Sequence, residues 1–500
     1  MNWQRRIVIV AALLGFVCFQ QLPVKAETSA KPNIVLFFVD DFGQRDLSCY
    51  GSALYETPHM DRLAKGGVRF TNAYAAYPRC VPSRQGLLSG KYPCRLENQM
   101  IQSGEHRHHL PLKEITFGEA LQEHGYETCY IGKWHLGKDG GGPGDQGFDT
   151  VIHSGSAGAT GDFFFPFPTE KGLSVTNPVE GTAGDYLTDR LTDEAVDYIH
   201  QHKEHPFLMV MAHYAVHTPI QAPEEITKKY QRKVRKAGIA VGGKREDADY
   251  VKDRQGMTKT LQNNPTYAAM VEKTDDSLGR IVAALKKAGI EDNTAILLTS
   301  DHGGLSTRGL ENRRATATSN APLRQGKGSI FEGGTRVPLI VKWPGHAEPG
   351  TTSDVQVTGT DHYPTMLQIA GAALRPKQHI DGRSYLRALR GESYQRDGML
   401  WYKWKARPDS TGDTRAISYI QGKYKLICWI DEELVELFDL AQDIGERENL
   451  ADEMPARTQR MLSVLLDQEE RIGNLRERGR KDLERRLHRA ASRKKGRDKG

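Results

Sequence analysis

Three carboxylates stand where apolar runs of the sequence end. Asp40 and Asp41 follow the run NIVLFFV directly, and Asp301 follows TAILLTS. Like charges this close together are costly unless a cation neutralises them. Together with a neighbouring donor such as His302 they suit a divalent ion bound through oxygen, Ca²⁺ before Mg²⁺. The alternative interpretation is that Asp41 caps the segment after it and Asp301 lies in a turn.

Several cationic or titratable side chains are expected in the same region. So much positive charge around a metal ion is explained by a compact anionic substrate, such as phosphate or sulfate. Taken alone, GKWH or VHTP would be a weak signal, because a lysine at the end of a strand is usually solvated. The candidates are Arg84, Lys133, His135, His217 and Lys327.

A cysteine occupies a special position in the stretch YPRCVPSRQGLLSG. Pro82 suits the first turn of a helix, so Cys80 is expected near a helix N-terminus. The helix dipole lowers the pKa of a thiol there and favours an anionic species. A thiolate nucleophile is one interpretation and a buried or disulfide-bonded cysteine is the other. Neither accounts for the metal ion.

The elements that must position these residues follow from hydrophobic patterning. Short apolar runs without alternation predict strands that are buried on both faces, as in a parallel sheet. Helical patterns lie between these runs, which is typical of an α/β sandwich with right-handed crossovers. We therefore predict a large, mixed, mostly parallel sheet between layers of helices. The runs are NIVLFFVDD, ETCYIGKWH, FLMVMAHYAVH, TAILLTSDHGG and VPLIVKWPG.

In such sheets, ligands bind beyond the carboxyl ends of the strands. The polar residues that end the runs should therefore meet in one place. For any one of them, a surface or capping role is the ordinary expectation, but for all of them together it is not. These residues are Asp40, Asp41, Lys133, His135, His217, Asp301 and His302.

The pattern changes near residue 392. MLWYKWK, RAISYIQGKYKLICWI and ELVELFDLAQD predict short strands with turns, and PARTQRMLSVLLDQEERI predicts a helix. We predict a catalytic domain over 27–391 and a smaller C-terminal α+β subdomain with an antiparallel sheet over 392–470. Residues 471–500 are rich in Lys and Arg and are predicted to be a disordered tail.

The first residues have a basic start, an apolar run and the ending VKA. This pattern predicts a signal peptide over 1–26, so the protein is expected to be exported, to the periplasm or beyond. No later segment is long and apolar enough to predict a membrane span. The formal net charge of +6 is carried by the tail and the signal rather than by the body. No nucleic-acid partner is predicted, although a tail contact with a polyanionic glycan stays open.

At this point the residues resemble a known family. CVPSR, residues 80–84, is similar to the Cys-x-Pro-Ser-Arg signature of type I sulfatases, which are arylsulfatase-like members of the alkaline phosphatase superfamily. The resemblance runs from KPNIVLFFVDD to ELFDLAQDIGERENLA and includes GKWHLG, VHTP, TSDHGG and GKGSIFEGGTRVPLIVKWPG in the family's order. It implies that a formylglycine-generating enzyme converts Cys80 to formylglycine.

The resemblance also implies roles for individual residues. One Ca²⁺ would be held by Asp40, Asp41, Asp301 and His302 together with the modified Cys80. Many family members have Asn at the position of His302, and a neutral imidazole is a poorer Ca²⁺ ligand than an amide oxygen. The remaining roles are orientation of formylglycine by Arg84, sulfate binding by Lys133 and Lys327, contact with the leaving oxygen by His217, and contact with formylglycine by His135.

The implied mechanism starts from hydrated formylglycine, whose hydroxyl attacks sulfur with help from Ca²⁺ and Asp301. His217 or Lys327 protonates the departing alcohol. His135 then removes the proton of the second hydroxyl, which expels sulfate and restores the aldehyde. An ordinary serine or thiol ester could not collapse in this way, so the chemistry requires an aldehyde at position 80.

The expected substrate is a sulfated carbohydrate, because no apolar hairpin for membrane docking is evident. Loop residues His108, Arg308, Arg313 and Arg314 are candidates to bind further sulfates or carboxylates, or are simply exposed charges. One alternative is a phosphodiester or phosphonate monoester hydrolase of the same superfamily. Another is a non-catalytic binder of sulfated glycans, which predicts the loss of an active-site residue.

Overall fold

The computed structural model describes residues 31–96, 109–137, 140–167, 175–241, 249–472, 481, 484–485 and 487–489. The predicted signal peptide, 1–26, and most of the predicted tail, 471–500, lie outside the described residues. Within the described ranges, no helix is both long and apolar enough to cross a membrane.

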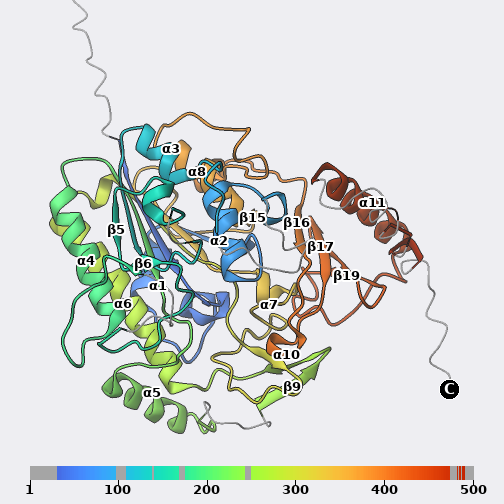
Figure 1. Ribbon diagram of the computed structural model, residues 1–500. Coiled ribbons are helices and arrows are strands. Elements are labelled where there is room, and N and C mark those ends of the chain that lie inside the picture. Colours follow the sequence, from blue (N-terminus) through green and yellow to red (C-terminus); the bar gives the residue numbers. More distant parts are fainter. Residues whose placement is uncertain are drawn as a thin grey trace, which may run out of the picture. The chain divides into compact units, whose positions relative to one another are not determined.

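The core element is an eight-stranded sheet (Figure 1). All neighbouring strands are parallel except at β13, which runs antiparallel to both of its neighbours. The predicted mixed, mostly parallel sheet is confirmed. In spatial order the strands are β14 (Thr351–Ser353), β2 (Val68–Phe70), β13 (Leu339–Lys342), β11 (Thr294–Ser300), β1 (Asn33–Val39), β8 (Phe207–His213), β4 (Glu127–Gly132) and β5 (Thr150–Ile152).

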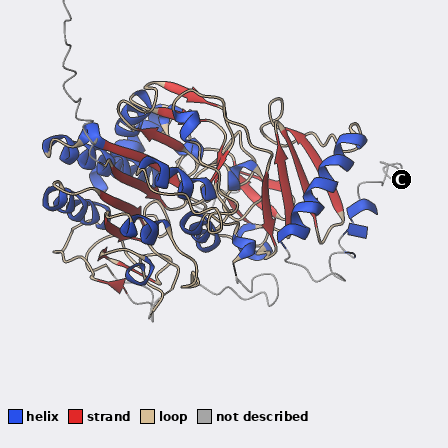
Figure 2. Ribbon diagram, turned by 90° about the horizontal axis from the view of Figure 1, so that it is seen from above, coloured by secondary structure: helices blue, strands red, loops and turns tan. Residues whose placement is uncertain are grey.

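Helices cover both faces of this sheet, as Figure 2 shows. Every residue of β1, β8 and β11 is buried. Successive side chains of a strand point to opposite faces of the sheet, and here each face is covered by a hydrophobic core. Thus Val35 and Phe37 join one hydrophobic cluster, whereas Ile34 and Leu36 join the other. The first cluster includes α1 (Pro58–Lys65), α4 (Leu187–His202), α5 (Glu224–Lys236) and α6 (Pro265–Lys287), and the second includes α2 (Cys80–Ser89), α3 (Phe117–Glu123), α8 (His362–Ile369) and α9 (Leu386–Leu389).

A four-stranded antiparallel sheet follows in the chain, as predicted. It consists of β16 (Met399–Lys403), β17 (Ala416–Gln421), β18 (Tyr424–Trp429) and β19 (Leu434–Asp439). Helix α11 (Pro455–Ile472) packs its Met461, Leu462 and Leu465 against this sheet. The exact domain boundary, between 391 and 392, stays a prediction.

Buried polar contacts join the small sheet to the large domain. The Nζ atom of Lys425 in β18 lies 2.8 Å from a carboxylate oxygen of Glu332 and 2.8 Å from one of Glu446. Glu332 begins the short helix α7 (Glu332–Thr335). Trp401 in β16 donates its indole N–H to the carbonyl of Ala75 at 2.8 Å. This docking brings the chain around residue 407 to the region of Cys80.

The remaining elements are short. They are β3 (Ala73–Tyr74) paired with β15 (Val357–Thr358), β6 (Ser154–Gly155) paired with β7 (Val175–Thr176), the sheet of β9 (Tyr250–Asp253), β10 (Gly256–Lys259) and β12 (Thr307–Gly309), and helix α10 (Pro408–Thr411).

Candidate active site

The register of the large sheet brings the predicted strand-end residues together. Val39 of β1 pairs with both His213 of β8 and Ser300 of β11, and Gly132 of β4 pairs with Ala212. Parallel strands that end in register present their next residues at one edge. Those residues are Asp40 and Asp41 after β1, Lys133 after β4, and Asp301 and His302 after β11.

Two loops carry Cys80 and Lys327 to this edge. Cys80 is the first residue of α2, whose ten residues are all buried. The loop that holds Lys327 is fixed by its backbone, since the Lys327 N–H donates to the Gly304 carbonyl at 3.1 Å and the Gly328 N–H donates to the Pro78 carbonyl at 2.7 Å. The two loops are therefore tied to each other and to the end of β11.

Four of the five predicted metal ligands form a compact group. Ligand atoms of Asp40, Asp41, Cys80 and His302 all lie within 4.8 Å of one another. The Nε2 atom of His302 is 3.2 Å from Cys80 Sγ and 3.3 Å from Asp41 Oδ1. Asp40 Oδ1 and Asp41 Oδ2 are buried and accept no hydrogen bond from the described residues. Buried carboxylate oxygens without donors fit a divalent cation bound through oxygen.

Asp301 stands beside this group, and its oxygens are already engaged. Its Oδ1 accepts the N–H of Asp41 at 3.1 Å, and its Oδ2 accepts from Nε of Arg84 at 3.1 Å. Its Oδ1 is 3.5 Å from Nε2 of His302. Asp301 can therefore orient its neighbours without a metal ion, and its role as a ligand stays a prediction.

Cations balance the buried carboxylates. Lys133 Nζ lies 2.5 Å from Asp40 Oδ2, and Lys327 Nζ lies 2.6 Å from Asp41 Oδ1. Arg84 donates from Nη1 to the Lys133 carbonyl at 2.7 Å, and its Nη2 is 3.5 Å from Asp40 Oδ1. These contacts join the predicted sulfate-binding lysines to the predicted metal ligands in one network.

The ionisable groups of this network have pKa values that are shifted in different directions. Burial, reinforced by Asp301, raises the pKa of Asp40. Burial would also raise the pKa of Asp41, but Lys327 and its other cationic neighbours outweigh burial and lower it. Burial opposes ionisation of Cys80 as well, yet Lys133 and Lys327 hold its thiol pKa well below the ordinary value. The site therefore favours an anion at position 80.

The two predicted catalytic histidines differ in environment. Burial lowers the pKa of His135 to about 4, an effect that a hydrogen bond to Cys80 opposes. A neutral imidazole beside Cys80 can accept a proton. His217 is partly exposed, and its Nε2 lies 3.8 Å from Asp41 Oδ2. Its position on the open side of the group suits contact with the part of a substrate that departs.

Two of the site residues hold unusual backbone conformations. Asp41 has φ of 58° and His135 has φ of 62°, in the left-handed region that residues other than glycine seldom adopt. Such conformations persist where the surrounding structure imposes them, often at functional sites. Gly158 packs on His135, and a Cβ at this position would lie 2.4 Å from a ring carbon. A glycine is therefore required at 158 to leave the imidazole in place.

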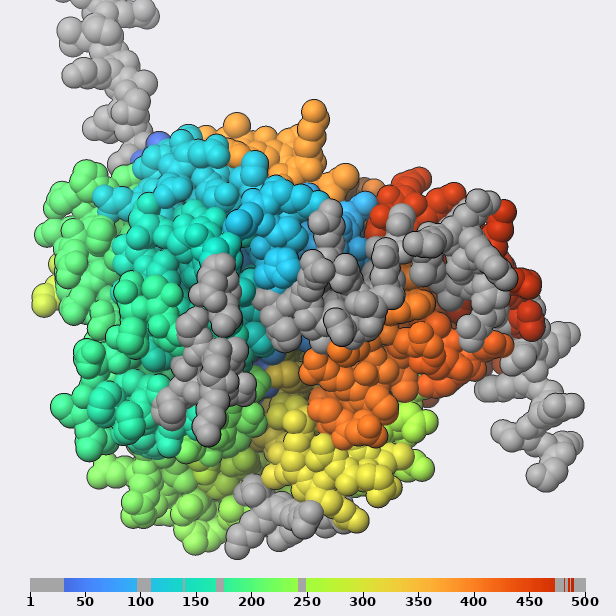
Figure 3. Space-filling model, viewed as in Figure 1, coloured from blue at the N-terminus to red at the C-terminus, as the bar shows by residue number. Residues whose placement is uncertain are grey.

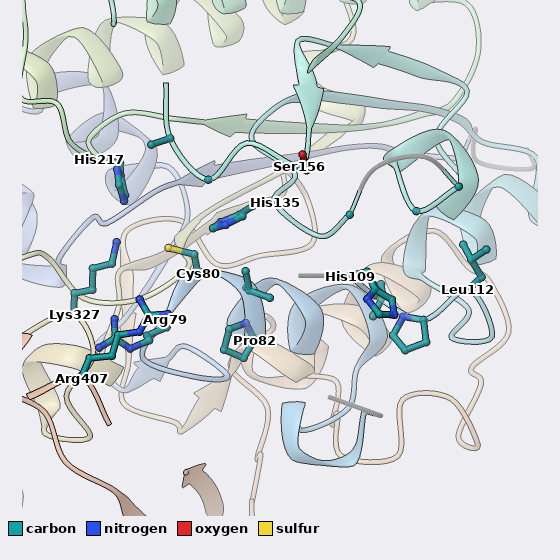
Figure 4. Close-up of a pocket in the computed structure, with 18 of the residues that line it drawn as sticks. Arg79, Cys80, Pro82, His109, Leu112, His135, Ser156, His217, Lys327 and Arg407 are labelled. Carbon is teal, nitrogen blue, oxygen red and sulfur yellow. The ribbon is translucent and has the colours of Figure 1, made fainter. Parts of the chain in front are cut away.

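A cavity of about 1090 Å³ opens from these residues. Cys80, His135, His217 and Lys327 lie at one end and His109 and Leu112 at the other (Figure 4). Figure 3 shows this face hollowed between the teal segment near residue 150 and the orange segment near residue 400. The cavity is far larger than a sulfate ion, so it has room for the group to which sulfate is attached.

Some cavity residues were missed by sequence reasoning. Arg79 and Arg407 line the cavity beside Cys80. The position of Arg79 next to Cys80 was a usable signal, whereas nothing in the sequence around Arg407 pointed to the site. Of the predicted subsite residues, Arg308 is buried with its guanidinium 4.3 Å from the Tyr250 ring centroid, and His108 lies outside the described residues. Arg313 and Arg314 are exposed and are not among the described residues that line the cavity.

Comparisons with known proteins agree with this geometry. The Sulfatase family model matches residues 32–372, and the model "N-sulphoglucosamine sulphohydrolase, C-terminal" matches residues 326–472. A "Sulfatase" of Formosa agariphila is 30% identical, with 90% of each chain covered. An "N-acetylgalactosamine-6-O-sulfatase" of Bacteroides thetaiotaomicron is 28% identical over 92% of this chain and 96% of the relative.

A solved structure shares the fold. The crystal structure of Ps i-CgsB in complex with k-i-k-neocarrahexaose superposes with a TM-score of 0.72 at 28% identity, covering 89% of this chain and 94% of the other. The family resemblance carried by CVPSR and the strand-end motifs is thereby confirmed. The chain belongs to the sulfatase family, within the alkaline phosphatase superfamily, and is a sulfuric ester hydrolase.

Proposed function

We propose that this sulfatase removes sulfate from a sulfated carbohydrate, by means of a formylglycine made from Cys80 and one bound Ca²⁺. The observation that carries the proposal is the grouping, at one end of a cavity, of Cys80, two lysines and two buried carboxylate oxygens that accept no hydrogen bond from the described residues. The carbohydrate assignment is supported by two similar proteins, one named N-acetylgalactosamine-6-O-sulfatase and one solved in complex with k-i-k-neocarrahexaose.

In this proposal, Asp40, Asp41, Asp301 and His302 hold the Ca²⁺ together with residue 80. When bound, the cation supplies positive charge that neutralises the carboxylates and polarises a sulfate oxygen. A formylglycine at position 80 would supply an oxygen nucleophile. Expulsion of sulfate would then restore the aldehyde, so that no separate hydrolysis of a bond between sulfate and the protein is needed.

The chain's own residues then have distinct tasks. Lys133 and Lys327 bind the sulfate oxygens, where the negative charge of the transition state develops. Arg84 fixes the orientation of residue 80 through its contacts with Asp301 and the Lys133 carbonyl. His217 or Lys327 gives a proton to the departing alcohol oxygen. His135 accepts a proton at position 80, for which its neutral imidazole is suited.

Export and maturation belong to the same proposal. The N-terminal pattern predicts passage through a secretory pathway, to the periplasm or outside the cell. A formylglycine-generating enzyme must act on Cys80, which is 7% exposed in the folded chain. We therefore expect this maturation partner to modify the chain before it folds.

The first test is mass spectrometry of the peptide that spans Tyr77–Lys91, from protein purified from its own host. We expect the mass decrease that accompanies replacement of the Cys80 thiol by an aldehyde. In parallel, wild-type protein should release sulfate from sulfated mono- or oligosaccharides, and the Cys80→Ala variant should not. The variant Cys49→Ala, at a half-buried cysteine outside the site, is the matched control.

Three results would contradict the proposal. An unmodified Cys80 in a fully active enzyme would exclude formylglycine. Turnover of aryl sulfates with no release from any defined sulfated saccharide would exclude the carbohydrate assignment. A higher kcat/KM for phosphodiesters or phosphonate monoesters than for sulfate esters would favour the other chemistry of the superfamily.

A further inference from the structure

The residue before Cys80 is a buried arginine that faces the cavity. Arg79 is 6% exposed and lines the cavity next to Cys80. Its Nη2 donates to Asp413 Oδ1 at 2.7 Å and to the Thr411 hydroxyl at 2.5 Å. Its Nε is buried and donates no hydrogen bond to the described residues. Residues of the C-terminal subdomain thus hold the guanidinium of Arg79, and its Nε–H remains available as a hydrogen-bond donor.

A second arginine reaches the same place from the C-terminal subdomain. Arg407 lines the cavity and lies beside Arg79 below Lys327 in Figure 4. Burial and then the positive charge of Arg79 lower the pKa of Arg407. Asp413 attracts Arg407 as well as Arg79, and it is also 2.5 Å from Nζ of the buried Lys403. Three cationic side chains therefore share this one carboxylate.

The lining of the cavity, as far as the described residues show it, is basic and apolar. The described residues that line it include basic side chains and apolar ones such as Val81, Pro82, Leu110 and Leu112, but neither Asp nor Glu. Charge-assisted hydrogen bonds are strong where apolar walls exclude water. An anionic group that entered would meet the guanidinium of Arg79, which Thr411 and Asp413 hold in place, and that of Arg407 beside it. Guanidinium groups are suited to the oxygens of carboxylate and sulfate.

We propose that Arg79 and Arg407 form a second anion subsite, which binds a sulfate or carboxylate group of the saccharide other than the sulfate ester under attack. The inference rests on the proposed carbohydrate sulfatase function and narrows its substrate class to polyanionic saccharides. Arg79 and Cys80 are consecutive residues, with Cα atoms about 3.8 Å apart. The second anionic group is therefore carried by the sulfated sugar itself or by the sugar next to it.

The test measures binding in the Cys80→Ala background, so that it does not depend on turnover. Isothermal titration calorimetry compares three probes: galactose 6-sulfate, galactose 4,6-disulfate, and a 6-sulfated N-acetylgalactosamine linked to a uronic acid. We expect the doubly charged probes to bind about tenfold more tightly than the singly charged one, since a charged hydrogen-bond pair is added. A preference for the disulfate or for the uronate then identifies which anion the subsite takes.

Arg407→Gln in the same background should remove most of this tenfold difference. The matched control is Arg387→Gln, which deletes one positive charge from an exposed side chain of α9 that does not line the cavity, and it should keep the difference. Arg79→Lys is the second variant, because it keeps the charge near Asp413 while it loses the guanidinium donors. It should lower the preference while the protein stays folded, which a cooperative thermal unfolding transition checks.

The outcomes separate the two proposals. If the modified wild-type enzyme hydrolyses monosulfated saccharides but the doubly charged probes bind no better, the subsite is refuted and the proposed function stands. The subsite is also refuted if Arg387→Gln lowers the preference as much as Arg407→Gln does. If enzyme carrying formylglycine hydrolyses no sulfated saccharide, the proposed function fails and the subsite fails with it.

Discussion

The carboxylate of Asp41 lies near one lysine and two histidines of the active site. Its carboxylate lies 2.6 Å from Lys327, 3.3 Å from His302 and 3.8 Å from His217. Its backbone adopts positive φ, which turns this carboxylate from the end of β1 into the site. Asp41 therefore links the proposed metal position, the lysine proposed to bind sulfate and the partly exposed His217.

Substitution of Asp41 tests the proposed calcium site. Asp41→Asn keeps the size of the side chain, and Asn tolerates the left-handed conformation. Ca²⁺ that binds only the folded state raises the unfolding free energy by about 2.7 kcal/mol at a hundredfold excess over Kd. We expect this rise, followed as Tm against Ca²⁺ concentration, in wild-type protein and its loss in Asp41→Asn. Asp431→Asn, at a surface ion pair with Arg415, should behave as wild type. An undiminished calcium effect in Asp41→Asn would place the ion elsewhere.

A side chain of helix α6 caps the N-terminus of helix α1. The backbone N–H groups in the first turn of α1 have no acceptor within the helix, and the side chain of the N-cap residue Thr57 does not accept from them. The carboxylate of Asp275 in α6 accepts these N–H groups instead, from His59 at 3.0 Å and from Met60 at 2.8 Å. The two helices are therefore held together by a polar contact within the apolar layer that supports β1.

Asp275→Ala is expected to destabilise the protein in a pH-dependent way. Loss of a cap costs about 1–2 kcal/mol. Burial raises the pKa of Asp275 to about 7, from an ordinary value of 3.8. The folded state thus keeps this proton over a range where the unfolded state has lost it, so the contribution of Asp275 to stability falls as pH rises from about 4 to about 7.

Urea unfolding of wild type and Asp275→Ala at pH 5 and pH 8 measures this effect. The difference in unfolding free energy between the two proteins should be larger at pH 5. Asp276→Ala, the neighbouring carboxylate on α6, is the control and should cost less because it caps no helix. An equal difference at both pH values would show that Asp275 is ionised throughout.

At the scale of the whole molecule, the small antiparallel sheet completes the cavity. Its subdomain supplies Arg407 and the partners of Arg79, and it is docked through Lys425, which lies between Glu332 and Glu446. All three of these side chains are buried. The position of the cavity wall therefore depends on an ion cluster between the small sheet and the large domain.

Lys425→Met should weaken the whole fold. Removal of one member of a buried ion cluster costs about 3–5 kcal/mol, because it leaves uncompensated charge behind. We expect this loss in the free energy of unfolding in urea, with a fall in kcat/KM for the carbohydrate substrate. Lys423→Met is the control, since Lys423 is exposed and pairs with Asp439 at the surface, and it should change stability little. Stability close to wild type in Lys425→Met would show that the cluster does not hold the sheets together.

The large sheet and the location of the site could both be predicted from the amino-acid sequence. Strands buried on both faces need continuous apolar runs, so β1, β4, β8 and β11 could be found without a structure. Parallel strands end at a common edge, so the polar residues after these runs could be predicted to meet. The motif CVPSR added the family resemblance, and Cys80 begins α2 as Pro82 indicated.

The residues that form the rest of the cavity could not be predicted in this way, because contacts between distant segments bring them together. Arg79 and Asp413 are 334 positions apart, and the Glu332–Lys425 and Asp275–Met60 contacts likewise join distant segments. Such contacts depend on how one sheet or helix docks on another, which short-range patterns of apolar residues do not specify. Tertiary packing likewise buried Arg308 against Tyr250, although the sequence had suggested Arg308 for a subsite, and it brought Arg407 into the cavity.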